Sequence, residues 1–253
     1  MSLLTIERLS VDGPGGKVIV RPVDLTVEPG EVVGLVGESG SGKTLTVLSL
    51  LGLLPDGVRA VSGDASLGGE QFLRNGRLLR RPHATMIFQD PTAALNPTMR
   101  IGAQIVRLLT FLKVDGDRRA RGETLLESVG IHDPRAVMGR YPHQLSGGMN
   151  QRVMIAMAIA AEPMLLIADE PTTGLDVTVQ AQILELIRST VATRGIGVLF
   201  VSHDLGVIAQ TCQRVAVMKA GEICELAVVD DIFHAPQAEY TRTLLASALD
   251  PAG

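Results

Sequence analysis

The chain has 253 residues, 46% of them hydrophobic, and a formal net charge of −4 at pH 7. This apolar content supports a substantial core without disulfide bonds. The slightly acidic balance, with no dense block of lysine and arginine, argues against a protein that binds nucleic acid. Cys212 and Cys224 lack a flanking metal-ligand pattern, so we expect a reducing compartment and thiols that are buried or inert.

The longest apolar runs, at 45–54 and 153–161, are shorter than the roughly 20 residues that a membrane span needs. The N-terminal segment MSLLTIERLS lacks the basic start and apolar core of a signal peptide. We therefore expect a cytoplasmic chain without a membrane span.

The segments LLTIERLSV and VIVRPVDLTV, within residues 1–30, alternate in strand fashion around the turn-rich DGPGG, which predicts an antiparallel hairpin. Three later segments, at 31–37, 164–169 and 197–204, are short apolar runs typical of strands buried on both faces. Helical segments separate them, which predicts an α/β fold with a mostly parallel sheet. Ligands of such sheets bind beyond the carboxyl ends of the strands.

Residues 91–160 show apolar residues at helical spacing and no strong strand pattern, which predicts a helical subdomain inserted into the α/β core. The segment that begins at Arg214 predicts a hairpin with its turn at Lys219, Ala220 and Gly221. The basic stretch RNGRLLRR at 74–81 is interpreted as a solvated loop in preference to a phosphate-binding patch.

Gly37, Gly42, Lys43 and Thr44 fit the pattern G-x-x-x-x-G-K-[ST] between a buried strand and a helix. In this arrangement the peptide N–H groups of residues 38–44 and the helix N-terminus surround an anionic phosphate. Lys43 would pair with β- and γ-phosphate oxygens, and Thr44 would place its hydroxyl on Mg²⁺.

Asp169 and Glu170 end the predicted strand LLIADE. An acid at the end of a buried strand beside a phosphate loop can hold Mg²⁺ through water, and the next carboxylate can orient or deprotonate the attacking water. In isolation, two acids in this position would as often only end the strand. The phosphate loop favours the catalytic interpretation.

The segment LSGGMNQR at 145–152 opens a long predicted helix with a serine and two glycines. Ser146 and the N–H groups of Gly147 and Gly148 would form a second anion site at this helix N-terminus. The chain is therefore predicted to have two phosphate-binding sites.

Over essentially its whole length the chain resembles the nucleotide-binding subunit of an ATP-binding cassette (ABC) transporter. The resemblance rests on the Walker A loop GESGSGKT, a Q-loop at Gln89, the signature LSGGM, the Walker B strand LLIADE, a D-loop around GLD at 174–176, and His203 in VSHD. It implies a P-loop NTPase core with a mostly parallel sheet, an N-terminal antiparallel β subdomain and the inserted helical subdomain. The single domain would span 1–253, with the core at 1–90 and 161–253 and the helical part at about 91–160.

The resemblance also implies the site residues. Glu170 would be the general base, His203 a partner of the γ-phosphate and water, and Gln89 a link from Mg²⁺ to the helical subdomain. The expected catalytic residues are thus Glu170, His203 and Lys43. The expected Mg²⁺ residues are Thr44, Gln89 and Asp169. The expected ATP-binding residues are Gly37, Glu38, Ser39, Gly40, Ser41, Gly42, Lys43, Thr44, Gln89, Ser146, Gly147, Gly148 and Asp176.

One feature departs from the family pattern. Family members usually offer an aromatic ring near the start of the chain to stack on adenine, and this sequence has no Phe, Tyr or Trp before Phe72. We expect adenine to rest on aliphatic side chains around Val18 to Val20, with looser base selectivity.

Within the family, the chain resembles the ATP-binding subunits of importers of oligopeptides, dipeptides, nickel and related solutes. The segments that carry this likeness are FQDPTAALNP, LSGGM and DVTVQAQIL. The ending at Gly253, without a cysteine-bearing extension, leans toward a nickel or metal-chelate importer. The resemblance implies a second ATP-binding subunit (a paralogue or another copy), two membrane permeases contacted through coupling helices, and an extracytoplasmic solute-binding protein that acts indirectly. The chain would lie at the cytoplasmic face of the plasma membrane.

Two other classes compete with the transporter motor. A soluble ABC-type ATPase of DNA repair or translation would need a coiled-coil insertion or a second cassette, and residues 91–145 are neither. An ABC-like subunit of a soluble multiprotein complex, of the phosphonate-breakdown type, has related sequences. Co-purification with membrane permeases would separate this class from the transporter motor.

Overall fold

The computed structural model describes residues 2–249, which fall into two compact units. The first unit takes residues up to 84, then 164–169, then residues from 190 onward. The second takes 85–163 and 170–189, and so encloses the helical region expected at about 91–160. Within 2–249 no helix is long and apolar enough to cross a bilayer.

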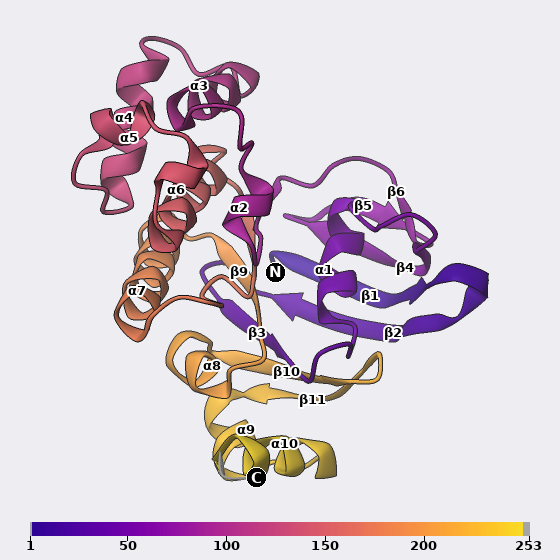
Figure 1. Ribbon diagram of the computed structural model, residues 1–253. Helices are drawn as coiled ribbons and strands as arrows, with labels where there is room; N and C mark the ends of the chain where they lie inside the picture. Colours follow the sequence, from indigo (N-terminus) through magenta and orange to yellow (C-terminus); the bar gives the residue numbers. More distant parts are fainter. Residues whose placement is uncertain (1, 250–253) are drawn as a thin grey trace. The chain divides into compact units, whose positions relative to one another are not determined.

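The first unit contains the predicted N-terminal hairpin as part of a five-stranded antiparallel sheet (Figure 1). Alternating apolar residues of its first strand, such as Leu4 and Ile6, are buried. The strand order is β2-β1-β4-β5-β6. These strands are β1 (Leu4–Asp12), β2 (Val18–Val27), β4 (Arg59–Leu67), β5 (Glu70–Arg74) and β6 (Arg77–Leu78).

The basic stretch at 74–81 is not a plain loop, which corrects our interpretation. Arg74 ends β5 and Arg77 begins β6, and the two residues pair across a tight antiparallel turn. Asn75 and Gly76 form the turn with φ of 48° and 72°. Both residue types tolerate positive φ, so this Asn-Gly pair is a hairpin signal that the surrounding arginines obscured.

The larger sheet contributes five strands to the first unit, in the order β11-β10-β3-β9-β8. β10–β3, β3–β9 and β8–β9 pair in parallel, and β10–β11 is antiparallel. Every residue of β3, β8 and β9 is buried, as their continuous apolar runs predicted. Their bounds are β3 (Val32–Val36), β8 (Leu165–Asp169), β9 (Gly197–Ser202), β10 (Arg214–Lys219) and β11 (Glu222–Val228).

Helices of the first unit follow these strands in the sequence. They are α1 (Lys43–Leu51), α8 (Leu205–Thr211), α9 (Val229–His234) and α10 (Glu239–Leu249), with a 3-10 turn at Pro14–Gly16. The parallel order of β3, β9 and β8 places the carboxyl ends of all three at one edge, where the polar residues of the candidate site begin.

The second unit is mainly helical, and a stripe of Ile101, Ile105 and Leu109 forms part of its core. Gly102 and Gly122 let two helices approach Met138 closely, since a Cβ at either glycine would lie within about 3 Å of this residue. The helices are α2 (Pro91–Ala94), α3 (Ile101–Phe111), α4 (Arg118–Ser128), α5 (Pro134–Met138) and α6 (Gly147–Ala160), with a 3-10 turn at Pro142–Gln144. β7 (Ala84–Ile87) and α7 (Val177–Arg194) each have residues in both units.

Candidate functional site: a phosphate loop and its carboxylates

The phosphate loop joins the end of β3 to the start of α1 in the first unit. Gly37 begins it at φ 152°, and a Cβ there would lie 2.0 Å from the carbonyl oxygen of Met218. Gly42 ends it at φ 105°, immediately before the helix. Only glycine fits the first position, because a side chain would collide with backbone.

Lys43 lies inside this loop and is only 6% exposed. Its Nζ donates to the carbonyl oxygen of Gly37 at 2.7 Å and to that of Glu38 at 3.0 Å. The loop therefore curls around its own cation. A buried ammonium group held in this way is positioned for an anionic ligand.

The residues of the loop fit a phosphate group. Helix α1 begins without a side-chain cap, so the N–H groups of its first turn and its positive dipole end are available to an anion. The hydroxyl of Ser41 is buried and, within the described chain, has no hydrogen-bond partner. A buried donor without an acceptor is costly, and a phosphate oxygen would satisfy it.

A hydroxyl and a carboxylate meet beside this loop. Thr44 Oγ1 lies 3.4 Å from Oδ1 of Asp169, which ends β8 and is 5% exposed. Hard oxygen ligands of this kind are the ones that Mg²⁺ prefers. The pair therefore fits the predicted role of Thr44 and Asp169 toward a magnesium ion.

Glu170 follows in the second unit, at a positive φ of 47° that non-glycine residues rarely adopt. Its Oε2 accepts from Nε2 of Gln89 at 2.9 Å and from Oγ1 of Thr173 at 3.0 Å. The structure thus brings the predicted base and the Q-loop glutamine together. Sequence reasoning did not identify Thr173, although it lies three residues from the predicted base.

The signature segment begins α6 in the second unit. Ser146 is the N-cap, and its Oγ accepts from the N–H of Met149 at 3.3 Å. Ser146 and Gly147 are exposed, and Gly148 packs against Val179, whose Cγ1 would lie 2.7 Å from a Cβ at position 148. Asp176 Oδ1 accepts from the N–H of Val179 at 3.0 Å and so caps the start of α7.

His203 follows β9 in the first unit and is exposed. The next residue, Asp204, caps α8 by accepting from the N–H groups of Gly206 and Val207 at 2.8 and 3.2 Å. This cap fixes the direction in which the chain leaves the sheet edge.

The aliphatic segment expected to support adenine is only partly suited to that role. Val20 is fully buried and packs toward Gly42, since a Cβ on the glycine would lie 3.1 Å from Val20 Cγ2. Our inclusion of Val20 is therefore wrong, because a buried side chain presents no surface to a base. Val18 is 56% exposed and Ile19 is half-buried, so these two remain available beside the loop.

Sequence reasoning also missed the supports of the phosphate loop. The N–H of Gly221 donates to the carbonyl oxygen of Ser41 at 2.9 Å, and the N–H of Glu38 donates to the hydroxyl of Tyr240 at 3.4 Å. Tyr240 is 202 residues from Glu38, and no local pattern links two positions at that separation.

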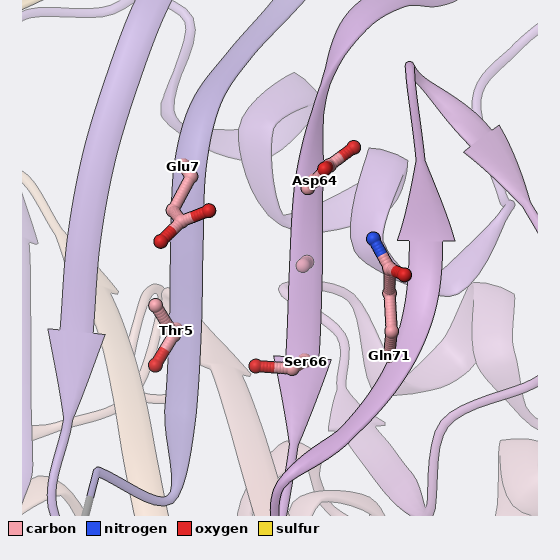
Figure 2. Close-up of a pocket in the computed structure, with 6 residues that line it drawn as sticks. Thr5, Glu7, Asp64, Ser66 and Gln71 are labelled. Carbon is pink, nitrogen blue, oxygen red and sulfur yellow. The ribbon is translucent and has the colours of Figure 1, made fainter.

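A hollow of about 170 Å³ lies away from these residues, on the antiparallel sheet. Figure 2 shows its polar side chains on three strands: Thr5 and Glu7 from β1, Asp64 and Ser66 from β4, and Gln71 from β5. Asp64 Oδ1 already accepts from the N–H of Asn75 at 2.7 Å. These polar groups cover the solvent face of a sheet whose other face is buried.

Comparison with known proteins gives a consistent result. The sequence model of the family described as ABC transporter matches residues 20–173. A probable D,D-dipeptide transport ATP-binding protein, DdpD of Escherichia coli K12, is 46% identical over 97% of this chain and 78% of its own length. The oligopeptide transport ATP-binding protein OppD of Lactococcus lactis subsp. cremoris SK11 is 46% identical over 90% of this chain and 69% of its own.

Solved structures show the same fold. One is cbiO1 from Clostridium perfringens, described as part of the ABC transporter complex cbiONQ, with a TM-score of 0.76 and 26% identity over 92% of this chain and 91% of that one. Another is the ATP-binding cassette MJ0796, a dimer in a post-hydrolysis state bound to ADP and Pi, with a TM-score of 0.74 and 27% identity over 89% of this chain and 98% of that one.

The family match covers more than half of the chain, and the curated relatives match it almost from end to end. These matches agree with the phosphate loop, the strand-end acid and the signature helix described above. The chain belongs to the ABC transporter family and is one of its ATP-binding, ATP-hydrolysing chains.

Proposed function

We propose that the chain is the ATPase motor of a membrane importer of dipeptides or oligopeptides. The observation that carries this proposal is the identity of 43–46% to dipeptide and oligopeptide transport ATP-binding proteins across at least 90% of the chain. The phosphate loop and its carboxylates support the motor role, because all the residue types needed for phosphoryl transfer are in place.

The relatives favour a peptide over the nickel or metal chelate that the sequence also allowed. DppD and OppD are named for dipeptide and oligopeptide transport. The solute itself is expected to be selected by the permeases and the solute-binding protein. A nickel complex is therefore an alternative substrate that the transport experiment below must include.

In the proposed mechanism the residues 37–44 bind the triphosphate of ATP, with Lys43 against the β- and γ-phosphate oxygens. Thr44, Asp169 and Gln89 would hold Mg²⁺. ATP supplies the phosphoanhydride bond that is cleaved. Glu170 takes the proton of the attacking water, and His203 orients that water and the γ-phosphate.

The signature residues Ser146, Gly147 and Gly148 would act on ATP held by another subunit, and Asp176 would lie beside the same nucleotide. Two features support a shared site. Ser146 and Gly147 are exposed at a helix N-terminus, where N–H groups favour an anion. The related cassette bound to ADP and Pi is a dimer. The companion is a second copy or a paralogue.

The chain would act at the cytoplasmic face of the membrane, bound to two permease subunits through their coupling helices. The solute-binding protein would influence the chain only through these permeases. No nucleic-acid partner is proposed, because the chain is slightly acidic.

The test is co-expression of the chain with the permease and ATPase genes beside its own, followed by detergent extraction and reconstitution in vesicles. We expect the chain to extract with the permeases. ATP hydrolysis should rise when the solute-binding protein is loaded with a dipeptide or oligopeptide, and not with a nickel complex. Recovery of the chain in a soluble assembly without permeases would contradict the transporter role. Stimulation by the nickel complex alone would contradict the peptide assignment.

A further inference from the structure

The Gly37–Glu38 peptide of the phosphate loop is held from both sides. Its carbonyl oxygen, on Gly37, accepts from Nζ of Lys43 at 2.7 Å. Its N–H, on Glu38, donates to the hydroxyl of Tyr240 at 3.4 Å. The two groups of a trans peptide point in opposite directions, so whatever fixes the N–H outward also directs the carbonyl inward.

Tyr240 is itself well fixed. The residue is 8% exposed, and Nζ of Lys219 lies 4.4 Å from the centroid of its ring. A cation above an aromatic face is attracted to it, which holds the ring in place. Burial raises the pKa of the Tyr240 phenol above its ordinary value, and the nearby Glu38 carboxylate adds to the rise. The hydroxyl therefore stays protonated and neutral at physiological pH.

The start of α10, which carries Tyr240, is tied to the β10–β11 hairpin. The carboxylate of Glu225, on β11, accepts from the N–H groups of Gln237 and Ala238 at 2.8 and 3.0 Å, just before the helix begins. These hydrogen bonds hold the pKa of Glu225 below its ordinary value, against the opposing effect of burial. The same hairpin contacts the loop directly, through the N–H of Gly221 and the carbonyl oxygen of Ser41.

We propose that Tyr240 is a positioning residue of the phosphate loop: its hydroxyl fixes the Gly37–Glu38 peptide, and this peptide fixes the Lys43 ammonium. The role does not depend on which solute is transported, because every contact lies within the first unit, around the loop that we propose to bind ATP. Without the hydroxyl the N–H of this peptide loses its partner, and the peptide is then held only on its carbonyl side, by Lys43. Nucleotide binding should weaken while the chemical step stays intact.

Tyr240→Phe is the direct test, because it keeps the ring and the Lys219 contact and removes only the hydroxyl. The first measurement is amide hydrogen exchange in the full chain without nucleotide. We expect the Glu38 amide to exchange about tenfold faster, since one hydrogen bond of modest strength is lost, while amides of β3 keep their rates.

The second measurement is the binding and hydrolysis of MgATP by the same variant. We expect Kd and KM to rise about 3- to 10-fold, the range for loss of one hydrogen bond, with kcat within about twofold of the unmodified chain. Tyr141→Phe is the matched control, because Tyr141 is the other of the two tyrosines and lies in the second unit.

Two results would overturn the proposal. One is a Glu38 exchange rate and an MgATP Kd for Tyr240→Phe that equal those of Tyr141→Phe. The other is faster exchange throughout the strands of the first unit, because Tyr240 would then stabilise the fold without any particular effect on the loop.

Discussion

At the scale of single residues, the site depends on a few groups whose surroundings define them. Lys43 is buried within its own loop, and Asp169 is buried at a strand end. Glu170 receives hydrogen bonds from a glutamine and a threonine. Buried charges such as Lys43 and Asp169 are costly to keep in a folded chain, and they gather at functional sites, which favours a functional interpretation.

Glu170→Gln tests the proposed general base. The glutamine keeps the size of the side chain and cannot accept a proton, so we expect kcat to fall by about 10²- to 10⁴-fold while MgATP still binds. Single-turnover hydrolysis and equilibrium binding give the two values. Glu162→Gln, a glutamate outside the proposed site, is the control. Undiminished turnover in Glu170→Gln would remove Glu170 from the role of base.

The two cysteines should differ sharply in reactivity, so only Cys212 fits the sequence expectation of buried or inert thiols. Cys212 is buried, and burial raises the pKa of its thiol far above the ordinary value, whereas Cys224 is exposed. The thiolate is the reactive form, so iodoacetamide at neutral pH should label Cys224 alone in the folded chain. Mass spectrometry checks this, with Cys224→Ser expected to stay unlabelled until urea is added. Labelling of Cys212 in the native chain would show that its surroundings are open.

At the scale of elements, β3 packs closely against α8. Gly34 permits this, because a Cβ there would lie 2.9 Å from Ile208 Cδ1 and 3.1 Å from Cys212 Sγ. We expect Gly34→Ala to lower the free energy of unfolding by about 1–3 kcal/mol, the usual effect of overpacking.

Urea unfolding measures this change, and a second substitution identifies its cause. Ile208→Val removes the Cδ1 atom, so the double variant Gly34→Ala/Ile208→Val should lose less stability than the sum of the two single variants. Strict additivity of the two changes would show that the contact with Ile208 is not the source of the loss.

Elements with strong local signals were predictable from sequence, and elements held by distant contacts were not. β3, β8 and β9 are continuous apolar runs because both faces are buried, and that pattern is visible in the sequence. β5 and β6 were not predicted, because an arginine-rich stretch is typical of a solvated loop. Only Asn75 and Gly76 indicate the turn between these two strands.

The candidate site likewise has one part that local sequence predicts and another that depends on distant contacts. The phosphate loop is a local motif that requires glycines at fixed spacing, and its position between a strand and a helix followed from sequence. The contact from Gln89 to Glu170 spans 81 residues, and that from Glu38 to Tyr240 spans 202. Such pairs depend on the tertiary fold, so no periodicity within a segment reveals them.

At the scale of the whole molecule, the proposed function assigns site residues to both compact units of the chain. The first unit contains Lys43, Thr44 and Asp169, and the second contains Ser146 and Glu170. The central claim is that ATP bound by the phosphate loop of one subunit is completed by the signature of another. Mixing of defective chains tests this claim directly, because each variant lacks a different half of the shared site.

The decisive measurement is ATP hydrolysis by an equal mixture of Lys43→Ala chains and Ser146→Arg chains. Each variant alone should be inactive, the first for lack of phosphate binding and the second for a blocked signature. Random pairing makes half of the dimers mixed, each with one intact site of two, so we expect about a quarter of the unmodified activity. A mixture that stays as inactive as its separate components would contradict a site shared between two copies of this chain.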